Sequence, residues 1–277
     1  MKWLFVLFLA IIIFGGAAWF GYNYVFKEDI QVAKEQRGEV TPEPRVDLSL
    51  PEYEAAAKLR QDGKIPEARA ALATYVQKYP TSPHADEAKD LLGELNVSIF
   101  LSRTPSPEKE EYIVKPGDVL AKVARKVKTT PELIMRMNNM SGTMLHIGER
   151  LLVSHPDFAI VVQRKQNLVI LLNHGGFFKQ YHIRELKVPA KASKVQTKVA
   201  EVMAWRDGKR VGFGTKEFIG SARWIRLANP SYTIYSVPDS AHQVVQPPPP
   251  QGIGLAAADA EELSSLINNK TGVTITD

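Results

Sequence analysis

Cysteine is absent from the 277 residues of the chain. Disulfide bridges, thiolate metal sites, cysteine nucleophiles and lipidation at a cysteine are therefore excluded. The six histidines are scattered, and no two have the spacing that places metal ligands on one face of a helix. We therefore assign the chain neither a metal nor another cofactor.

A strong excess of charge of one sign is also missing, because 35 Lys+Arg residues stand against 30 Asp+Glu residues, a formal net charge of +5. A total this small does not indicate nucleic acid as a partner. The basic residues are concentrated between His155 and Asn229, whereas the segment from Pro230 onward is acidic. Two interpretations stay open for the basic region: a solvated sheet surface, or a face that attracts anionic wall polymer or lipid headgroups.

Charged side chains are absent from Trp3 to Tyr22. A helix of this length covers about 30 Å, the thickness of bilayer hydrocarbon. A cleaved signal peptide is the alternative, with Gly16 to Ala18 as its small residues, but the apolar stretch is longer than is usual for one and bulky Trp19 follows. We expect residues 1–26 to form an uncleaved single-pass anchor in the cytoplasmic (inner) membrane, with the bulk of the chain on the extracytoplasmic, periplasmic side.

A polar linker at residues 27–50 precedes a helical region at 51–101. The first predicted helix begins at Pro51 and ends before Asp62-Gly63, and the second runs from Pro66 to Tyr79 with apolar residues three and four apart. Ser82 followed by Pro83 starts the third.

Two phrases in this region, Gly63 to Ala68 and Tyr79 to Ala88, resemble tetratricopeptide-like repeats of bacterial envelope proteins. Only about one and a half repeats are present, and a stacked solenoid generally needs at least three. We expect a small helical spacer, which either docks a protein partner or only separates its neighbours.

A second linker is predicted at residues 102–110, where two prolines and alternating charges oppose regular structure. Behind it, Tyr112 to Lys115 indicates a strand, Val119 to Val127 a helix, and Thr130 with Pro131 the start of another helix. Arg150 to Val153 completes the segment as a final strand.

The segment at 111–154 follows the pattern Tyr112-x-Val114-x-x-Gly117-Asp118-x-Leu120, then Ala124, Leu133, Asn138, Leu145, Gly148 and Leu151-x-Val153. This order resembles the lysin-motif (LysM) family over its whole length. The resemblance implies a βααβ fold that binds a polymer containing N-acetylglucosamine, here peptidoglycan, between two loops. The glycan-binding residues that it implies are Gly117, Asp118, Val119, Leu120, Met144, Leu145, His146 and Ile147.

One position departs from the family pattern, because Val119 stands where Thr or Ser is usual. That hydroxyl would cap the first helix, and its loss costs about 1 kcal/mol of local stability unless Asp118 replaces it.

The remainder, 158–277, is predicted to be mainly β. Apolar and other residues alternate from Phe158 to Leu172, with an interruption at Lys165 to Asn167. Asn173 to Gly176 then predicts a hairpin turn. Further strands are predicted at Lys198–Trp205, Arg210–Phe213, Thr233–Ser236 and Val273–Ile275, with a helix at Ala258–Leu266.

Two phrases of this region resemble the catalytic domain of L,D-transpeptidases. Tyr232 to Ser236 falls where that family has Tyr-Gly-Ile-His-Gly, and Gly252 to Leu255 falls where it has Cys-Ile-Arg-Leu. Carried over residue by residue, the base histidine becomes Tyr235, the nucleophilic cysteine becomes Gly252 and the arginine becomes Gly254. The thioester chemistry of that family needs a thiolate and a proton acceptor.

We therefore expect a degenerate domain without catalytic residues, in which Tyr235, Gly252 and Gly254 are vestigial. Ser236 is the hydroxyl nearest the lost site, and no His, Asp or Lys is placed by sequence to activate it. The sequence thus predicts a multidomain α+β protein that comprises a transmembrane helix, an α-helical spacer, a βααβ LysM domain and a mainly-β L,D-transpeptidase-like domain. It favours a non-enzymatic, membrane-anchored peptidoglycan-binding envelope protein, whose transpeptidase-like domain acts as a scaffold or binds stem peptides. The alternative is an envelope enzyme that acts on peptidoglycan with a rebuilt, non-cysteine active site.

Overall fold

A computed structural model describes residues 47–103, 106–188, 194–229, 232–238 and 252–277. The chain divides into two units, Met1–Leu48 and Ser49–Asp277, and the described helices and strands all belong to the second. The anchor expected at 1–26 lies outside the described residues. Within the described ranges, no helix combines the length and the apolar character that crossing a membrane requires.

The helical region consists of α3 (Leu50–Gln61), α4 (Ile65–Lys78) and α5 (Ala85–Leu101), which confirms that it contains three helices. The start predicted for the third at Ser82-Pro83 was wrong, because α5 begins at Ala85 after a turn. Prolines lie in the first turns of α3 and α4, where a missing N–H costs nothing. Gly63 has φ +73° and turns the chain between them. The small residues Ala56, Ala68 and Ala88 are fully buried, so the three helices pack closely.

The LysM segment contains β1 (Lys109–Ile113), α6 (Leu120–Lys126), α7 (Pro131–Met137) and β2 (Arg150–Ser154), in the predicted βααβ order. The strands pair antiparallel, with Tyr112 opposite Leu151. The boundary of the linker expected at 102–110 was wrong, because β1 begins inside it. Lys109 pairs with Ser154, and its ammonium donates to the carbonyls of Ile99 and Ser102 at 2.8 and 2.6 Å.

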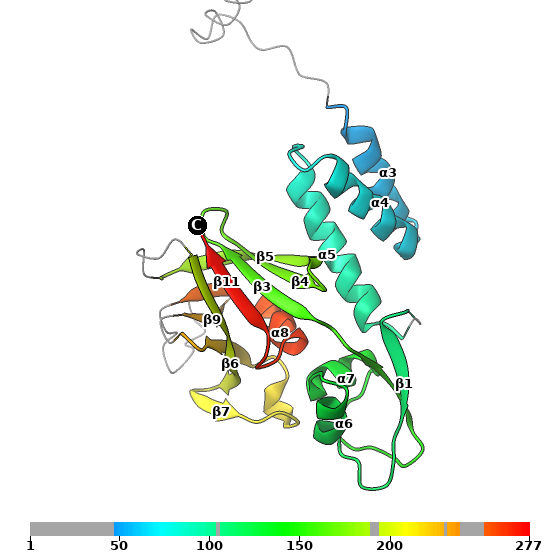
Figure 1. The fold of residues 1–277 in the computed structure, drawn as a ribbon, viewed down its shortest axis with the longest axis vertical. Coiled ribbons are helices and arrows are strands. Elements are labelled where there is room, and N and C mark those ends of the chain that lie inside the picture. Colours follow the sequence, from blue (N-terminus) through cyan, green and yellow to red (C-terminus); the bar gives the residue numbers. More distant parts are fainter. Residues whose placement is uncertain (1–46, 104–105, 189–193, 230–231, 239–251) are drawn as a thin grey trace, which may run out of the picture. The chain divides into compact units, whose positions relative to one another are not determined.

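The third part is a curved sheet with one helix against it (Figure 1). Its strands are β3 (Phe158–Gln163), β4 (Leu168–Asn173), β5 (Gly176–Leu186), β6 (Lys194–Arg206), β7 (Lys209–Val211), β8 (Ala222–Leu227), β9 (Thr233–Val237), β10 (Ile253–Ala256) and β11 (Gly272–Thr276). The short η2 (Lys216–Phe218) precedes β8, and α8 (Ala257–Leu266) follows β10.

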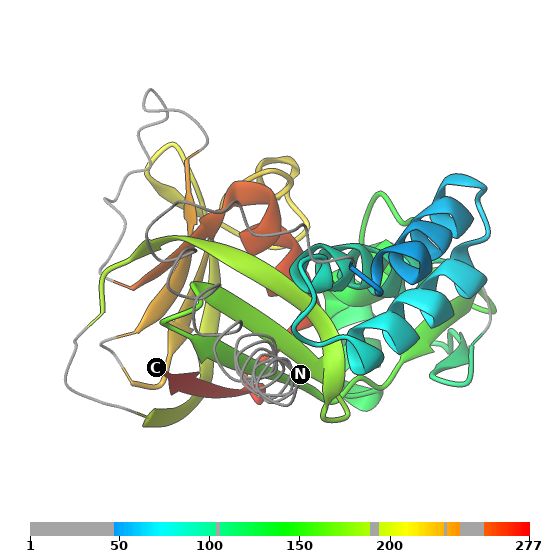
Figure 2. The same ribbon diagram turned by 90° about the horizontal axis from the view of Figure 1, so that it is seen from above.

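The strand order is β11-β3-β4-β5-β10-β9-β8-β6-β7, and β11 also pairs with β6. This last pairing closes the sheet into a barrel, as the view from above shows (Figure 2). Closure leaves β7 as an appendage on β6. The pairs β9–β10 and β3–β11 are parallel, and the other pairs are antiparallel.

The expected turns at 165–167 and 173–176 connect β3 to β4 and β4 to β5. Three strands differ from the prediction. Strand β10 was not predicted, because Gly252 to Leu255 was interpreted only as a motif. The strand expected at Arg210–Phe213 is the shorter β7, Lys209–Val211, and β8 was missed because its charged residues concealed the buried face.

The three parts share a hydrophobic core. Helix α7 contributes Leu133 and Met137 to the core of the barrel, whereas the intervening Ile134 packs in the core of the LysM segment. Helix α5 contributes Phe100, whose ring lies edge-on to those of Phe158 and Phe178. The LysM segment therefore packs directly on the barrel.

Candidate functional site

The two LysM loops expected to bind glycan flank the same end of the β1–β2 pair. Val114 donates its N–H to the carbonyl of Glu149, and its carbonyl accepts from the N–H of Gly148, both at 2.9 Å. These bonds extend the ladder beyond β1 and bring the loop of residues 117–120 beside that of residues 144–147. Gly117 and Gly148 have φ of +80° and +85°. These positive values allow the turn that follows β1 and the turn that precedes β2.

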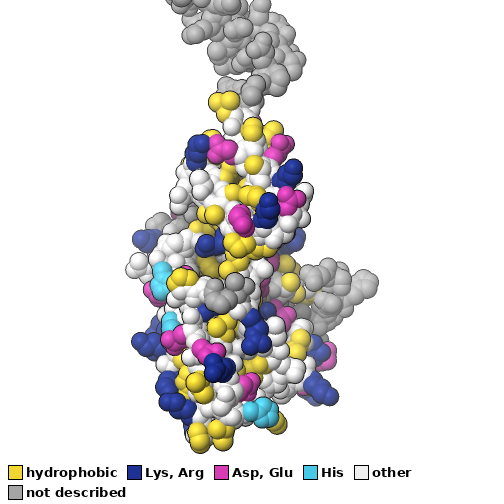
Figure 3. Space-filling model, turned by 90° about the vertical axis from the view of Figure 1, so that its right-hand side faces the viewer, with side chains coloured by type: hydrophobic (Ala, Val, Ile, Leu, Met, Phe, Trp, Pro, Cys, Tyr) yellow, Lys and Arg dark blue, Asp and Glu magenta, His cyan; other side chains and the backbone are white. Residues whose placement is uncertain are grey.

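The five apolar side chains among the eight predicted glycan-binding residues fall into two groups. Val119, Met144 and Ile147 are 52%, 77% and 73% exposed, although all three are apolar. Hydrophobic side chains are visible at this end of the LysM segment (Figure 3). Leu120 is buried and Leu145 packs against the LysM core, so these two support the loops from within. Exposed apolar side chains beside backbone polar groups suit the face and the hydroxyls of a sugar ring.

Asp118 stabilises the first loop and does not cap α6. Its Oδ2 accepts from the N–H of Lys115 at 2.9 Å and from the hydroxyl of Tyr112 at 2.7 Å. The pKa of the Asp118 carboxyl is lowered, first by the hydrogen bond from the Lys115 backbone N–H and then by the hydrogen bond from the Tyr112 hydroxyl. Helix α6 has no side-chain cap at Val119, so Asp118 does not replace the missing hydroxyl.

His146 is exposed, and its backbone takes part in a turn in which its N–H donates to the carboxylate of Glu149 at 2.9 Å. Asn138 has a role that the pattern alone did not reveal. Its amide accepts from the N–H of Leu152 and donates to the Leu152 carbonyl, both at 2.7 Å, and thereby joins the end of α7 to β2.

The three positions that we predict to be vestigial lie close together in the barrel: Tyr235 on β9, Gly254 on β10 and Gly252 directly before β10. In the parallel β9–β10 pair, Gly254 lies opposite Tyr235, and Gly252 directly precedes β10. Tyr235 is buried, and its hydroxyl donates to the carboxylate of Glu185 at 3.0 Å. Burial, followed by this hydrogen bond, raises the pKa of Tyr235 to about 12, so the phenol stays protonated near neutral pH.

No side chain fits at either glycine without movement of its neighbours. A Cβ on Gly252 would lie 2.0 Å from the carbonyl oxygen of Thr233, so the backbone itself would have to shift. A Cβ on Gly254 would lie 2.5 Å from a methyl of Val237 and 3.0 Å from Cβ of Glu185. The close approach of β9 and β10 thus occupies the space that a cysteine and an arginine would need.

Ser236 lies on the other face of β9 from Tyr235, because successive residues of a strand alternate. Its hydroxyl is buried, accepts from the backbone N–H of Arg223 at 2.8 Å, and contacts the Arg223 carbonyl at 3.4 Å. Among the described residues, no histidine, aspartate or lysine contacts this hydroxyl.

A cluster of four charges, which sequence reasoning missed, lies between the LysM segment and the barrel. Glu132 and Arg136 come from α7, Arg223 comes from β8, and Glu261 comes from α8. Arg136 lies 3.2 Å from Glu132 and 3.4 Å from Glu261, and Arg223 lies 3.4 and 3.5 Å from the same two carboxylates. We call these residues the charge quartet.

Arg223 is the most buried member of the quartet, at 1% exposure. Its guanidinium lies 3.8 Å from the ring centre of Phe218, and it donates to the Phe218 carbonyl at 3.0 Å and to the hydroxyl of Ser221. Burial lowers the pKa of Arg223 and raises that of Glu132, while the opposite charges act against both changes. The quartet borders a cavity of about 520 Å³.

Residues 112–154 match the family model of the LysM domain. The chain therefore contains a LysM domain, which confirms that resemblance. Comparison with curated proteins gives no match.

Solved L,D-transpeptidases resemble the described fold. A Mycobacterium smegmatis enzyme is 9% identical, with a TM-score of 0.31, over 47% of this chain and 64% of its own. L,D-transpeptidase 3 from Mycobacterium tuberculosis, in complex with a faropenem-derived adduct, is 10% identical, with a TM-score of 0.31, over 50% and 78%. The Enterococcus faecium catalytic domain acylated by ertapenem is 12% identical, with a TM-score of 0.29, over 43% and 96%. A likeness at this level concerns the fold and not the activity.

Proposed function

We propose that this chain is a peptidoglycan-binding protein of the bacterial envelope, whose LysM domain binds glycan containing N-acetylglucosamine. The observation that carries the proposal is the LysM match at 112–154, together with the exposed apolar side chains Val119, Met144 and Ile147 on its two loops. Residues 1–26 anchor the chain in the cytoplasmic membrane, with the described part on the outer side of it. The apolar stretch of the sequence supports this anchor.

We further propose that the barrel has no transpeptidase activity and acts as a scaffold. The absence of cysteine, the protonated Tyr235 and the crowding at Gly252 and Gly254 support this. The helices α3 to α5 serve as a spacer between the anchor and the rest of the chain. This spacer is fixed to the barrel, because the Asn96 side chain of α5 donates to the Phe178 carbonyl at 2.7 Å. No observation favours the alternative of a rebuilt enzyme over this proposal.

Co-sedimentation of the full chain with insoluble peptidoglycan tests the glycan assignment. The double variant Met144→Ser/Ile147→Ser should lose most of the binding and keep its stability, because both side chains are exposed. Ile113→Ser is the matched control, since Ile113 is a half-exposed apolar residue of β1 outside the two loops. Unchanged sedimentation of the double variant would refute the assignment. Incubation with muropeptides tests the second proposal, because any new cross-link or released D-alanine would contradict it.

A further inference from the structure

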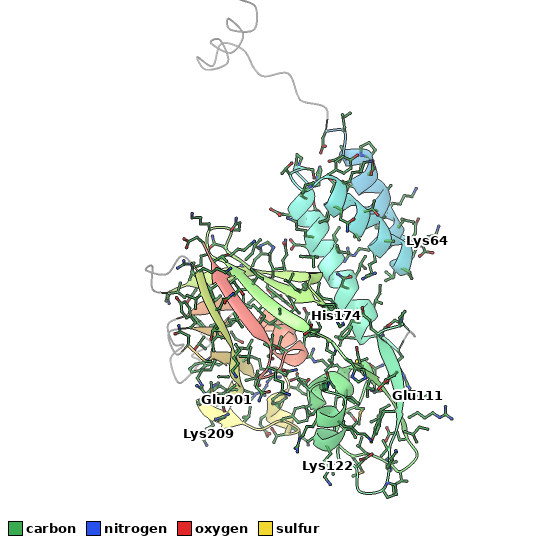
Figure 4. All side chains as sticks on the ribbon, viewed as in Figure 1. Lys64, Glu111, Lys122, His174, Glu201 and Lys209 are labelled. Carbon is green, nitrogen blue, oxygen red and sulfur yellow. The ribbon has the colours of Figure 1, made fainter. Side chains whose placement is uncertain are left out.

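The cavity beside the charge quartet has an apolar wall and a charged floor. The wall consists of Leu101, Met135, Met140, Phe213, Phe218 and Ile219. The floor consists of the charge quartet, which has no net charge. In Figure 4, Glu111 and Lys122 mark the LysM domain, and Glu201 and Lys209 mark the neighbouring part of the barrel.

The floor offers hydrogen-bonding groups of both kinds to a ligand. All four contacts within the quartet use Nη2 of an arginine and Oε1 of a glutamate. Among the described residues, no protein donor reaches Oε2 of Glu132 or Glu261, and no protein acceptor reaches Nε or Nη1 of Arg136. These three side chains are partly exposed. The cavity can therefore receive a cationic and an anionic group together.

This combination selects a class of ligand. A simple anion would meet two carboxylates, and an acyl chain would desolvate four charges without a compensating bond. A short peptide with aliphatic side chains, a free carboxylate and an amino group satisfies both the wall and the floor. A cavity of about 520 Å³ lies within the range of small-ligand sites, roughly 300 to 1,000 Å³.

The cavity adjoins the proposed glycan site through one loop. Asn139, Met140, Ser141 and Gly142 line the cavity, and Met144 to Ile147 form the second glycan loop. Only Thr143 separates these stretches, and its methyl lies 3.2 Å from the position of a Cβ on Gly214, another lining residue. A ligand would need to span on the order of 10 Å to occupy both, since consecutive Cα atoms are about 3.8 Å apart.

We propose that the cavity binds the short peptide carried by the glycan strand whose sugars occupy the LysM loops. The inference rests on the proposed function, because the peptide arrives attached to that glycan. The site is separate from the vestigial positions. Arg223 and Trp224 are adjacent on β8 and so point to opposite faces of the sheet, and Trp224 is the register partner of Tyr235.

Calorimetric titration of the full chain tests this proposal with three ligands: peptidoglycan oligosaccharides that carry their peptides, the same oligosaccharides stripped by an amidase, and the free peptide. The unmodified chain should bind the peptide-bearing glycan about tenfold more tightly than the stripped glycan, a gain that two additional charged contacts can supply.

Gly142→Phe should remove this preference and leave binding of the stripped glycan unchanged. Gly142 lines the cavity and a Cβ there meets no atom within 4 Å, so a ring at this position is expected to narrow the cavity without displacing the backbone. Gly272→Phe is the matched control, since Gly272 also has open space and lies outside the cavity. Arg136→Gln should weaken the preference in the same direction, with Arg226→Gln, an exposed ion-paired arginine of β8, as its control.

The outcomes separate the two proposals. Equal binding of both glycans by the unmodified chain, or a preference that survives Gly142→Phe, would overturn the peptide site and leave the glycan site standing. Binding of neither glycan would overturn the proposed function. In that case, free-peptide binding that disappears in Gly142→Phe would still support the cavity as a peptide site, and its absence would refute both.

Discussion

The carboxylate of Glu132, on helix α7 of the LysM domain, lies 3.4 Å from the guanidinium of Arg223, which is buried in strand β8 of the barrel. The two residues are 91 positions apart in the sequence. Their contact joins the proposed glycan-binding domain to the barrel through charge, in addition to the apolar contacts of Leu133 and Met137. The effect of its loss on the free energy of unfolding therefore measures how strongly the LysM domain and the barrel stabilise each other.

Loss of one partner should be costly. We expect Arg223→Met to lower the free energy of unfolding by about 3 kcal/mol, because it leaves two partly buried carboxylates with Arg136 as their single cation and the Phe218 carbonyl without its guanidinium donor. The double variant Arg223→Met/Glu132→Met retains the neutral pair Arg136–Glu261 and should cost less than the sum of the two single variants. Urea titration of all four proteins measures the coupling. Additive losses would mean that the two residues do not interact.

The missing helix cap should be restored by a single change. Val119→Thr is expected to raise the stability by a few tenths to about 1 kcal/mol, because α6 has no side-chain cap and Asp118 is already bonded elsewhere.

Helix α7 supplies the converse variant. Thr130 accepts from the N–H of Leu133 at 3.0 Å and also donates to the Ser265 carbonyl, so Thr130→Val should lose at least as much as Val119→Thr gains. Thermal unfolding of both variants measures these changes, and a lower melting temperature for Val119→Thr would contradict the capping argument.

The crowding at Gly252 predicts a strong preference for glycine. Gly252→Ala should lower the free energy of unfolding by about 3 kcal/mol, because its Cβ would overlap the Thr233 carbonyl. Gly272→Ala, at a position with open space, should have an effect within about 0.5 kcal/mol. Chemical denaturation compares the two. A well-tolerated Gly252→Ala would also weaken the view that a cysteine cannot be accommodated at this position.

Asp118 should remain ionised to unusually low pH. Since its folded pKa lies below the ordinary value of about 3.9, its contribution to stability is complete above that value and is lost as the pH falls through the folded pKa. A carbon-detected NMR titration of the carboxyl measures this. Tyr112→Phe should raise the pKa of Asp118 only in part, because the larger contribution from the Lys115 N–H remains. An unchanged pKa in this variant would refute the role of Tyr112.

Local chemistry made much of the fold predictable from the sequence. Prolines and apolar residues three and four apart identified α3 and α4, and the turns at Gly117 and Gly148 identified the LysM loops. The quartet was not predictable, since its members come from three distant elements and each reads as an ordinary surface charge. Strand β8 was concealed in the same way, because Arg223 is a charged residue that occupies a buried position.

Pairings between distant segments were equally inaccessible to sequence reasoning. The closure of the barrel depends on β11 lying between β3 and β6, and nothing in residues 272–276 indicates either partner. From local composition, the LysM domain and the barrel were predicted as two separate domains, whereas they share a core. A buried face of α7 was predicted from Leu133, Ile134 and Met137. Their division between two cores was not.

That division has a consequence for how the protein unfolds. A short helix whose alternate faces belong to different cores cannot leave one of them without exposing residues of the other. The LysM domain and the barrel should therefore melt in one cooperative transition, in contrast to modules that are joined only by a linker and that lose their structure one after the other.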